Sequence, residues 1–219
     1  MLGDLTTVIS RSTCSVCNED PLPGLQTLIS RVLQQVRGRN DIDDKTLQYL
    51  MVNDPRLGRF YLLPKIQKRL FSVPGRPVIS NCAYITKNIF SFLDFYLQPL
   101  TTKVKSYIKD TNDFLLKLKS LPSLPANAIL CTIDVVGLYP STLDAMRKAL
   151  DARDDKDIGT ESLIQLADLV LKNIFFEHNQ GIFKQERGTA IGTGGKYLNL
   201  CMGCEIIITS KLECLNRSL

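Results

Sequence analysis

The sequence predicts an α+β protein, because segments with helical periodicity alternate irregularly with short extended segments along one chain. The 219 residues are 44% hydrophobic and 22% charged, an ordinary globular composition that excludes collagenous and highly charged disordered chains. The extended segments are too few and too uneven for a doubly wound parallel sheet. We therefore expect helices combined with a limited sheet, without internal repeats.

The predicted helices share an apolar stripe with a repeat of three to four residues. They are expected at residues 25–36, 45–52, 89–100, 111–119, 141–150 and 163–174. Gly38 follows the first helix as a stop signal, and Asp110 or Thr111 is a candidate N-cap of the fourth. Ser141 and Asp144 resemble a capping box at the start of the fifth helix.

The predicted strands are apolar segments bounded by proline, glycine or a turn. Residues 59–66 read as extended chain, and residues 73–80 read as a turn that leads into a strand. Residues 128–136 read as a buried strand that ends near Asp134. Asn-Gln-Gly at residues 179–181 predicts a hairpin turn between two short strands, and the glycine-rich stretch that follows predicts a loop.

Positive charge is concentrated in the middle of the chain. Residues 56–120 carry 12 basic and 3 acidic residues, net +9, whereas residues 1–55 and 121–219 each have a net charge of −2. Neutralisation of phosphates by Lys and Arg drives nucleic-acid binding that does not depend on sequence, so this block is a candidate surface for a polyanion. A solvated basic face is the alternative interpretation of the same charges.

Membrane and secretory segments are not expected. The longest apolar-rich stretch, residues 163–176, is interrupted by polar residues and is shorter than the roughly 18 residues of a membrane span. The first fifteen residues lack a basic start and an apolar core. Seven scattered cysteines fit a reducing compartment better than a disulfide framework. We expect an intracellular protein, nuclear or cytoplasmic, with no membrane partner.

Two further motifs are weaker candidates for ligand sites. Cys14-x-x-Cys17 and Cys201-x-x-Cys204 look like zinc half-sites, but they lie far apart in the sequence, and the second pair lies in an apolar run. The glycine-rich segment fails the phosphate-loop pattern, because Ala190 stands where the pattern requires glycine. A surface role is expected for the single histidine, at position 178.

Aromatic residues beside basic ones, as in Arg59-Phe60-Tyr61, would suit base stacking, and they would equally suit a core. Asp134 ends an otherwise apolar strand, and an isolated buried carboxylate is costly. Carboxylates at strand ends hold the two Mg²⁺ ions of nucleotidyl transfer, although one aspartate alone cannot build such a site. The alternative is that Asp134 only caps a turn.

A series of sequence blocks resembles Penelope-like retroelement reverse transcriptases. In order, these blocks are GRFYLLPKIQK, PGRPVISNC, FLDFYLQPL, SYIKDTNDFL, ILCTIDVVGLYPS, QERGTAIGT and YLNLCMG. The resemblance extends from about Asp44 to Leu212, and its specificity comes from the order and number of the blocks. It implies a right-hand polymerase fingers/palm fragment with an incomplete antiparallel palm sheet. The implied division is an N-terminal helical segment at 1–43, a fingers-like region at 44–125 and a partial palm at 126–219.

The resemblance also implies roles for individual residues. Asp134 would be the first catalytic aspartate and a Mg²⁺ ligand, and Tyr139 would be the aromatic residue that selects deoxynucleotides. The residues expected to bind the nucleotide are Lys65, Arg76, Tyr139, Gln185, Gly188 and Gly192. Lys68 and Arg69 are expected to contact nucleic acid. The implied partners are an RNA template, a DNA primer or an RNA–DNA hybrid, and deoxynucleoside triphosphates.

The chain departs from the family pattern in places. Pro140-Ser141-Thr142-Leu143 stands where the family usually has Thr-Asn-Ile-Pro, and no Tyr-x-Asp-Asp precedes Leu219. We therefore expect a truncated reverse-transcriptase domain that is inactive alone, and the sequence leaves open whether a partner chain completes the palm. A non-catalytic nucleic-acid-binding remnant is the main alternative. A decayed fragment that folds poorly is another, because an incomplete palm sheet would expose an unpaired edge.

Overall fold

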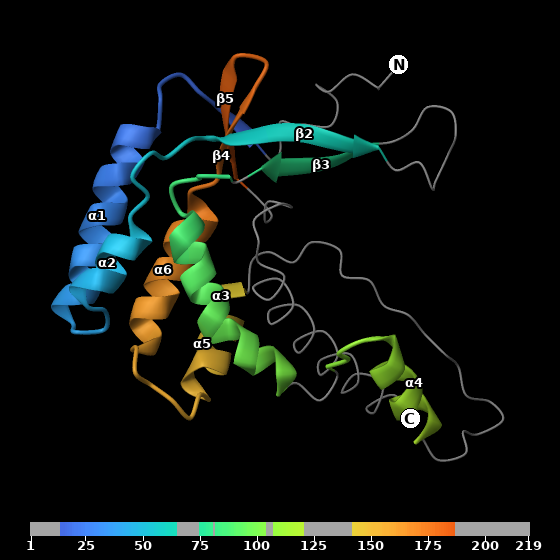
Figure 1. The fold of residues 1–219 in the computed structure, drawn as a ribbon. Coiled ribbons are helices and arrows are strands. Elements are labelled where there is room, and N and C mark those ends of the chain that lie inside the picture. Colours follow the sequence, from blue (N-terminus) through green and yellow to red (C-terminus); the bar gives the residue numbers. More distant parts are fainter. Residues whose placement is uncertain (1–13, 65–74, 81, 104–106, 121–141, 187–219) are drawn as a thin grey trace, which may run out of the picture.

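The computed structural model describes residues 14–64, 75–80, 82–103, 107–120 and 142–186, and it confirms the α+β class. The helices are α1 Leu22–Gly38, α2 Asp44–Leu50, α3 Lys87–Thr102, α4 Thr111–Lys119, α5 Thr142–Asp151 and α6 Thr160–Lys172. The strands are β1 Cys14–Cys17, β2 Gly58–Pro64, β3 Gly75–Ser80, β4 Phe175–His178 and β5 Gly181–Gln185. Figure 1 shows the sheet at one end of a bundle that α1, α2, α3, α5 and α6 form.

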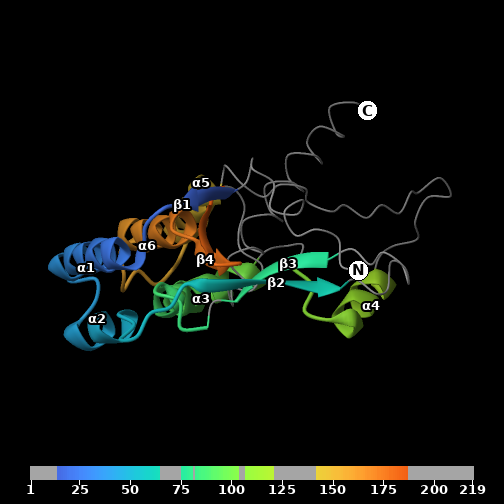
Figure 2. The same ribbon diagram turned by 90° about the horizontal axis from the view of Figure 1, so that it is seen from above.

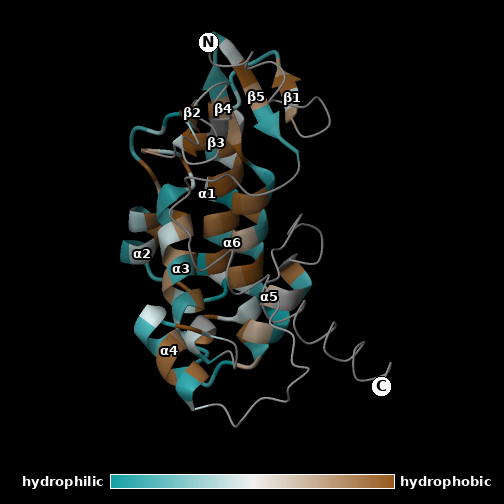
Figure 3. Cartoon of the chain, turned by 90° about the vertical axis from the view of Figure 1, so that its right-hand side faces the viewer, coloured by the Kyte–Doolittle hydropathy of each residue, from teal (hydrophilic) through white to brown (hydrophobic). Residues whose placement is uncertain are grey.

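Helix α6 is the centre of the bundle, because α1, α3 and α5 all pack against it. Its residues Leu163, Leu166 and Ala167 have no exposed surface. Helix α1 contributes the apolar stripe that its sequence predicts, and Leu33 and Val36 are fully buried in it. Burial of such side chains contributes about 1.5–3 kcal/mol each, which makes this cluster the main source of stability. Figure 3 shows hydrophobic residues along α6, the helix at the centre of the bundle.

Side-chain carboxylates cap three helices. Asp43 accepts a hydrogen bond from the backbone N–H of Thr46 at the start of α2, and Asp110, one of the two candidates in the sequence, caps α4. At α6 the N-cap residue is Gly159, which has no side chain. Asp41, from the turn after α1, supplies the carboxylate instead and accepts a hydrogen bond from the Gly159 N–H at 2.8 Å.

The five strands form one mixed sheet in the order β1-β5-β4-β2-β3. Strands β2 and β4 are parallel, and the other three neighbouring pairs are antiparallel. The sheet joins segments that lie far apart in the sequence: β1, near residue 15, pairs with β5, near residue 183. Figure 2 shows the sheet from above, with β2 and β3 extending away from the bundle.

The two faces of the sheet have different neighbours. Phe175 and Ile182 pack with the helix core, whereas Phe60, Phe176 and Phe183 form a second cluster with Ile79 on the other face. The alternation of side chains along a strand explains the separation. It also separates Cys14 from Cys17, because Cys14 packs against the second cluster and Cys17 against the helix core. The two thiols therefore do not form a zinc half-site.

Most of the predicted elements within the described residues are present. All six predicted helices occur there, and Asn179 and Gln180 form the predicted hairpin turn with φ angles of 46° and 64°. Strand β1 was not predicted. The strand expected at 128–136 and the capping Ser141 lie outside the described residues. Within those residues no helix is long and apolar enough to cross a membrane.

Candidate functional site

The most basic part of the sequence adjoins the hairpin of β2 and β3. These strands are antiparallel, in register from Arg59 opposite Ser80 to Pro64 opposite Gly75. Arg76 lies opposite Leu63, one step from the end of the hairpin. The two sequence blocks GRFYLLP and GRPVIS are therefore paired in space, and Arg76 is held near the point where the chain leaves β2.

Gln185 occupies a different part of the same sheet. It is the last residue of β5, it lies opposite Cys14, and its backbone N–H donates to the Ile174 carbonyl at 2.8 Å. Following the strand pairing from β5 across β4 to β2 places Gln185 at the height of Arg56 in the sheet. Arg76 lies at the height of Leu63, so the two residues are seven positions apart along the strand direction. Seven residues of strand span about 23 Å. The structure therefore places Arg76 and Gln185 at opposite ends of the sheet.

The other predicted site residues share one property, namely that they lie outside the described residues. They are Lys65, Lys68, Arg69, Asp134, Tyr139, Gly188 and Gly192. Their positions and roles stay predictions. Among the described residues, no group of three or more His, Cys, Asp or Glu side chains could hold a metal ion.

A buried tyrosine fixes the junction between α6 and β4. Tyr84 is 2% exposed, and its hydroxyl donates to the Asn173 carbonyl at 2.6 Å and accepts from the Phe175 N–H at 2.9 Å. Burial raises the pKa of the Tyr84 hydroxyl far above its ordinary value, so the group stays protonated and keeps both hydrogen bonds. The hydroxyl thereby satisfies two backbone groups where the helix ends and the strand begins.

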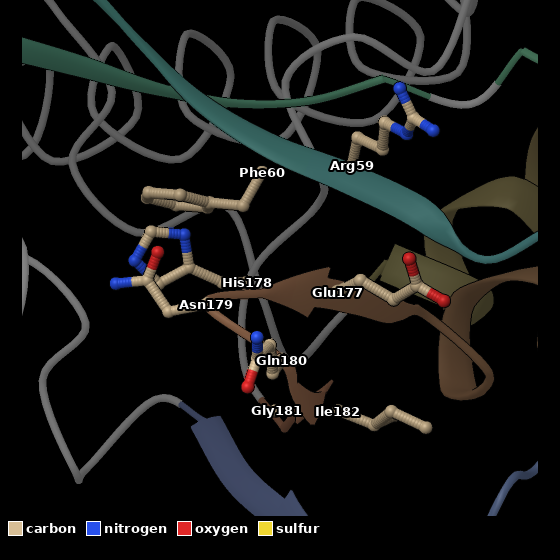
Figure 4. A pocket seen from close by; sticks show the side chains of 8 residues that line it. All are labelled: Arg59, Phe60, Glu177, His178, Asn179, Gln180, Gly181 and Ile182. Atoms are coloured by element: carbon tan, nitrogen blue, oxygen red, sulfur yellow. The ribbon is translucent and has the colours of Figure 1, made fainter.

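The sheet also contains a pocket that the sequence did not reveal. It has a volume of about 680 Å³ and lies between β2 and the β4–β5 hairpin. Figure 4 shows Phe60, His178 and Asn179 on one side of the strands, with Arg59 and Glu177 on the other. The only sequence signals for this pocket were the Arg59-Phe60-Tyr61 motif and the predicted turn. Neither signal indicated that the two segments are neighbours.

Comparisons of the chain with protein-family models, with curated proteins and with solved structures each found no match. The described fold defines an α+β protein with a mixed five-stranded sheet. The proposed function therefore depends on the residues and geometry of this chain.

Proposed function

We propose that the chain is the fingers and the first part of the palm of a reverse transcriptase, of the Penelope-like retroelement kind. The reaction of such a domain is template-directed addition of a deoxynucleotide to a 3′-hydroxyl with release of pyrophosphate. In this proposal Arg76 and Lys65 bind the triphosphate, and Tyr139 selects the sugar. Asp134 is the carboxylate that would hold Mg²⁺, and Gly188 and Gly192 line the template and nucleotide site. Gln185 is not part of this proposal, because it lies at the opposite end of the sheet from Arg76.

One observation supports the proposal most strongly. The blocks GRFYLLP and GRPVIS pair as a single antiparallel hairpin, with Pro64 opposite Gly75. The residues from 65 to 76 include four cations, Lys65, Lys68, Arg69 and Arg76, and no acidic residue. A triphosphate needs fixed cations, and Arg binds phosphate through a rigid fork of donors. A hairpin whose connecting segment is rich in cations suits that task.

The 219 residues contain only part of the set of carboxylates that two-metal catalysis requires. Divalent ions that bridge phosphate oxygens would stabilise the charge that develops in nucleotidyl transfer. Asp134 is one carboxylate, and no Tyr-x-Asp-Asp accompanies it in the 219 residues. One carboxylate does not provide the ligands of a two-metal site. We therefore predict that these 219 residues alone do not extend a primer.

A primer-extension assay tests the assignment. The purified chain is incubated with a primed RNA template, deoxynucleotides and Mg²⁺ or Mn²⁺, alongside the Asp134→Ala variant. We expect no extension from either protein, but cross-linking of a photoreactive deoxynucleoside triphosphate that Arg76→Ala reduces at least tenfold. Template-dependent extension that persists in Asp134→Ala would contradict the role of this aspartate. Unchanged cross-linking in Arg76→Ala would contradict the triphosphate site.

A second candidate function is nucleic-acid binding without catalysis. The net charge of +9 in residues 56–120 favours it, because each phosphate contact makes affinity dependent on salt. Reversal of the four cations at 65, 68, 69 and 76 should weaken binding to an RNA–DNA hybrid and reduce the salt slope by about 3. A matched control reverses four exposed cations of the other blocks, Arg31, Lys45, Lys148 and Lys156. Equal effects in both variants would show that only net charge matters.

A further inference from the structure

Helix α4 has no buried residue, whereas every other described helix has at least one. It makes no extensive contact with another described helix or strand, and Figures 1 and 2 both show it apart from the bundle. A helix of nine residues is marginal in water on its own. The stability of α4 therefore depends on its capping and on whatever covers its apolar side.

Three large apolar side chains lie on one side of α4. Phe114, Leu115 and Leu118 are 42%, 45% and 42% exposed. Leu118 lies four and three positions after the other two, and residues at this spacing are neighbours on a helix surface. Leu116 is also exposed but lies on a different side, where the residues three and four positions away from it are polar. We call Phe114, Leu115 and Leu118 the α4 face, because a contiguous apolar group on a helix suits a partner, whereas single exposed residues are ordinary.

The charges of α4 are divided between its two ends. Asp110 and Asp113 lie at its start, and Lys117 and Lys119 lie at its end. Asp113 and Lys117 pair within the helix at 2.8 Å, whereas Lys119 forms no ion pair with a described residue. The acidic start and the basic end complement the helix dipole. They also make the helix complementary to a copy of itself that runs in the opposite direction.

An apolar face between an acidic start and a basic end matches one partner best, namely a second α4. We infer that two copies of this chain associate through the α4 face, with the two helices antiparallel. Asp113 and Lys117 are each two residues from Leu115, so a pair centred on Leu115 places Asp113 of each copy opposite Lys117 of the other. A parallel pair would place like charges together, and a uniformly anionic surface would attract the lysines but repel the aspartates.

The arrangement has two-fold symmetry, in which the same patch of both copies forms the interface. One short helix from each copy covers less than the roughly 800 Å² per partner of a standard interface. The dimer should therefore be weak and reversible. The inference goes beyond the proposed function, because it concerns association and involves neither Arg76 nor Asp134.

Sedimentation velocity of the full chain tests the inference. We expect the average mass to rise from monomer toward dimer between about 1 µM and about 1 mM protein. Leu118→Gln should weaken dimerisation about tenfold, because each dimer then loses two apolar anchors. Leu116→Gln is the matched control in the same helix: it makes the same substitution on the other side and should leave dimerisation unchanged.

The paired charges give a second test that does not depend on how well each variant folds. Lys117→Glu and Asp113→Lys should each weaken dimerisation, because like charges then face each other between copies. A mixture of the two variants should dimerise more strongly than either variant alone, because both contacts between copies again join opposite charges. Mixing cannot restore the ion pair within each helix, so the gain reports contact between copies.

The matched control for the charge reversals uses Glu19→Lys and Arg31→Glu. Both residues are exposed, and neither forms an ion pair with a described residue. These variants should dimerise as the natural chain does, with no gain on mixing. A mass that stays monomeric at millimolar concentration, or dimerisation of Leu118→Gln equal to that of the natural chain, would overturn the inference. Because no variant alters Arg76 or Asp134, failure here is distinct from failure of the proposed function.

Discussion

The hydroxyl of Tyr84 offers a sharp test of how α6 is joined to the sheet. Tyr84→Phe removes one oxygen atom and keeps the ring, so the packing of this fully enclosed side chain is retained. The Phe175 N–H loses its acceptor, and the Asn173 carbonyl loses its donor. A buried polar group left without a partner costs about 1–3 kcal/mol, and a carbonyl is less costly to leave unpaired than an N–H. We expect the free energy of unfolding to fall by about 2–3 kcal/mol.

Urea denaturation followed by circular dichroism measures this change. Hydrogen exchange at the Phe175 amide should accelerate in the same variant, because its acceptor is gone. Tyr49→Phe is the matched control: Tyr49 is 54% exposed, and its hydroxyl bonds to no described residue, so stability should change by less than about 0.5 kcal/mol. If Tyr84→Phe were as stable as the natural chain with an unchanged denaturant slope, the reasoning about the junction would be refuted.

Two further predictions concern the start of α6. Asp41→Ala removes the acceptor of the Gly159 N–H and of the buried Ser162 hydroxyl, and it should lower the free energy of unfolding by about 2 kcal/mol in the same urea assay. Arg147 holds the pKa of Glu161 below its ordinary value of 4.5, so their ion pair stabilises the fold above that pH and the stabilisation is lost as the pH falls. Glu161→Gln should therefore flatten the decline in stability between pH 5 and pH 3, and an unchanged decline would remove this pair from the explanation.

Local elements of the fold were predictable where one short segment carries its own signal. The stripe from Leu25 to Val36 specifies α1, because the apolar residues recur at the helical period and are buried on one side. Of the two predicted caps of α4, Asp110 is the one observed, since its carboxylate accepts a hydrogen bond from the Asp113 N–H at 2.9 Å. The turn at Asn179 and Gln180 was equally visible, because such residues tolerate the left-handed conformation better than branched ones.

Features that depend on distant pairing were not predictable. Strand β1 has four residues, of which Val16 is 68% exposed, so neither its length nor its burial gives a period-two pattern. The pocket exists only because β2 and β4 pair in parallel at two positions and then separate, which no local pattern encodes. The sequence predicted that Arg76 lies in a strand. Only the register of the structure shows that its partner in the sheet is Leu63.

The pairing of β1 with β5 has a consequence for how the chain is made. Ser15 donates to the carboxylate of Glu186, a contact between residues 171 positions apart. At the usual 5–20 residues per second, a ribosome needs about 9–34 s to make that length of chain. During this interval the first strand has been synthesised but its neighbour in the sheet has not. Throughout this interval the strand edge that β5 will cover has no partner from the later chain.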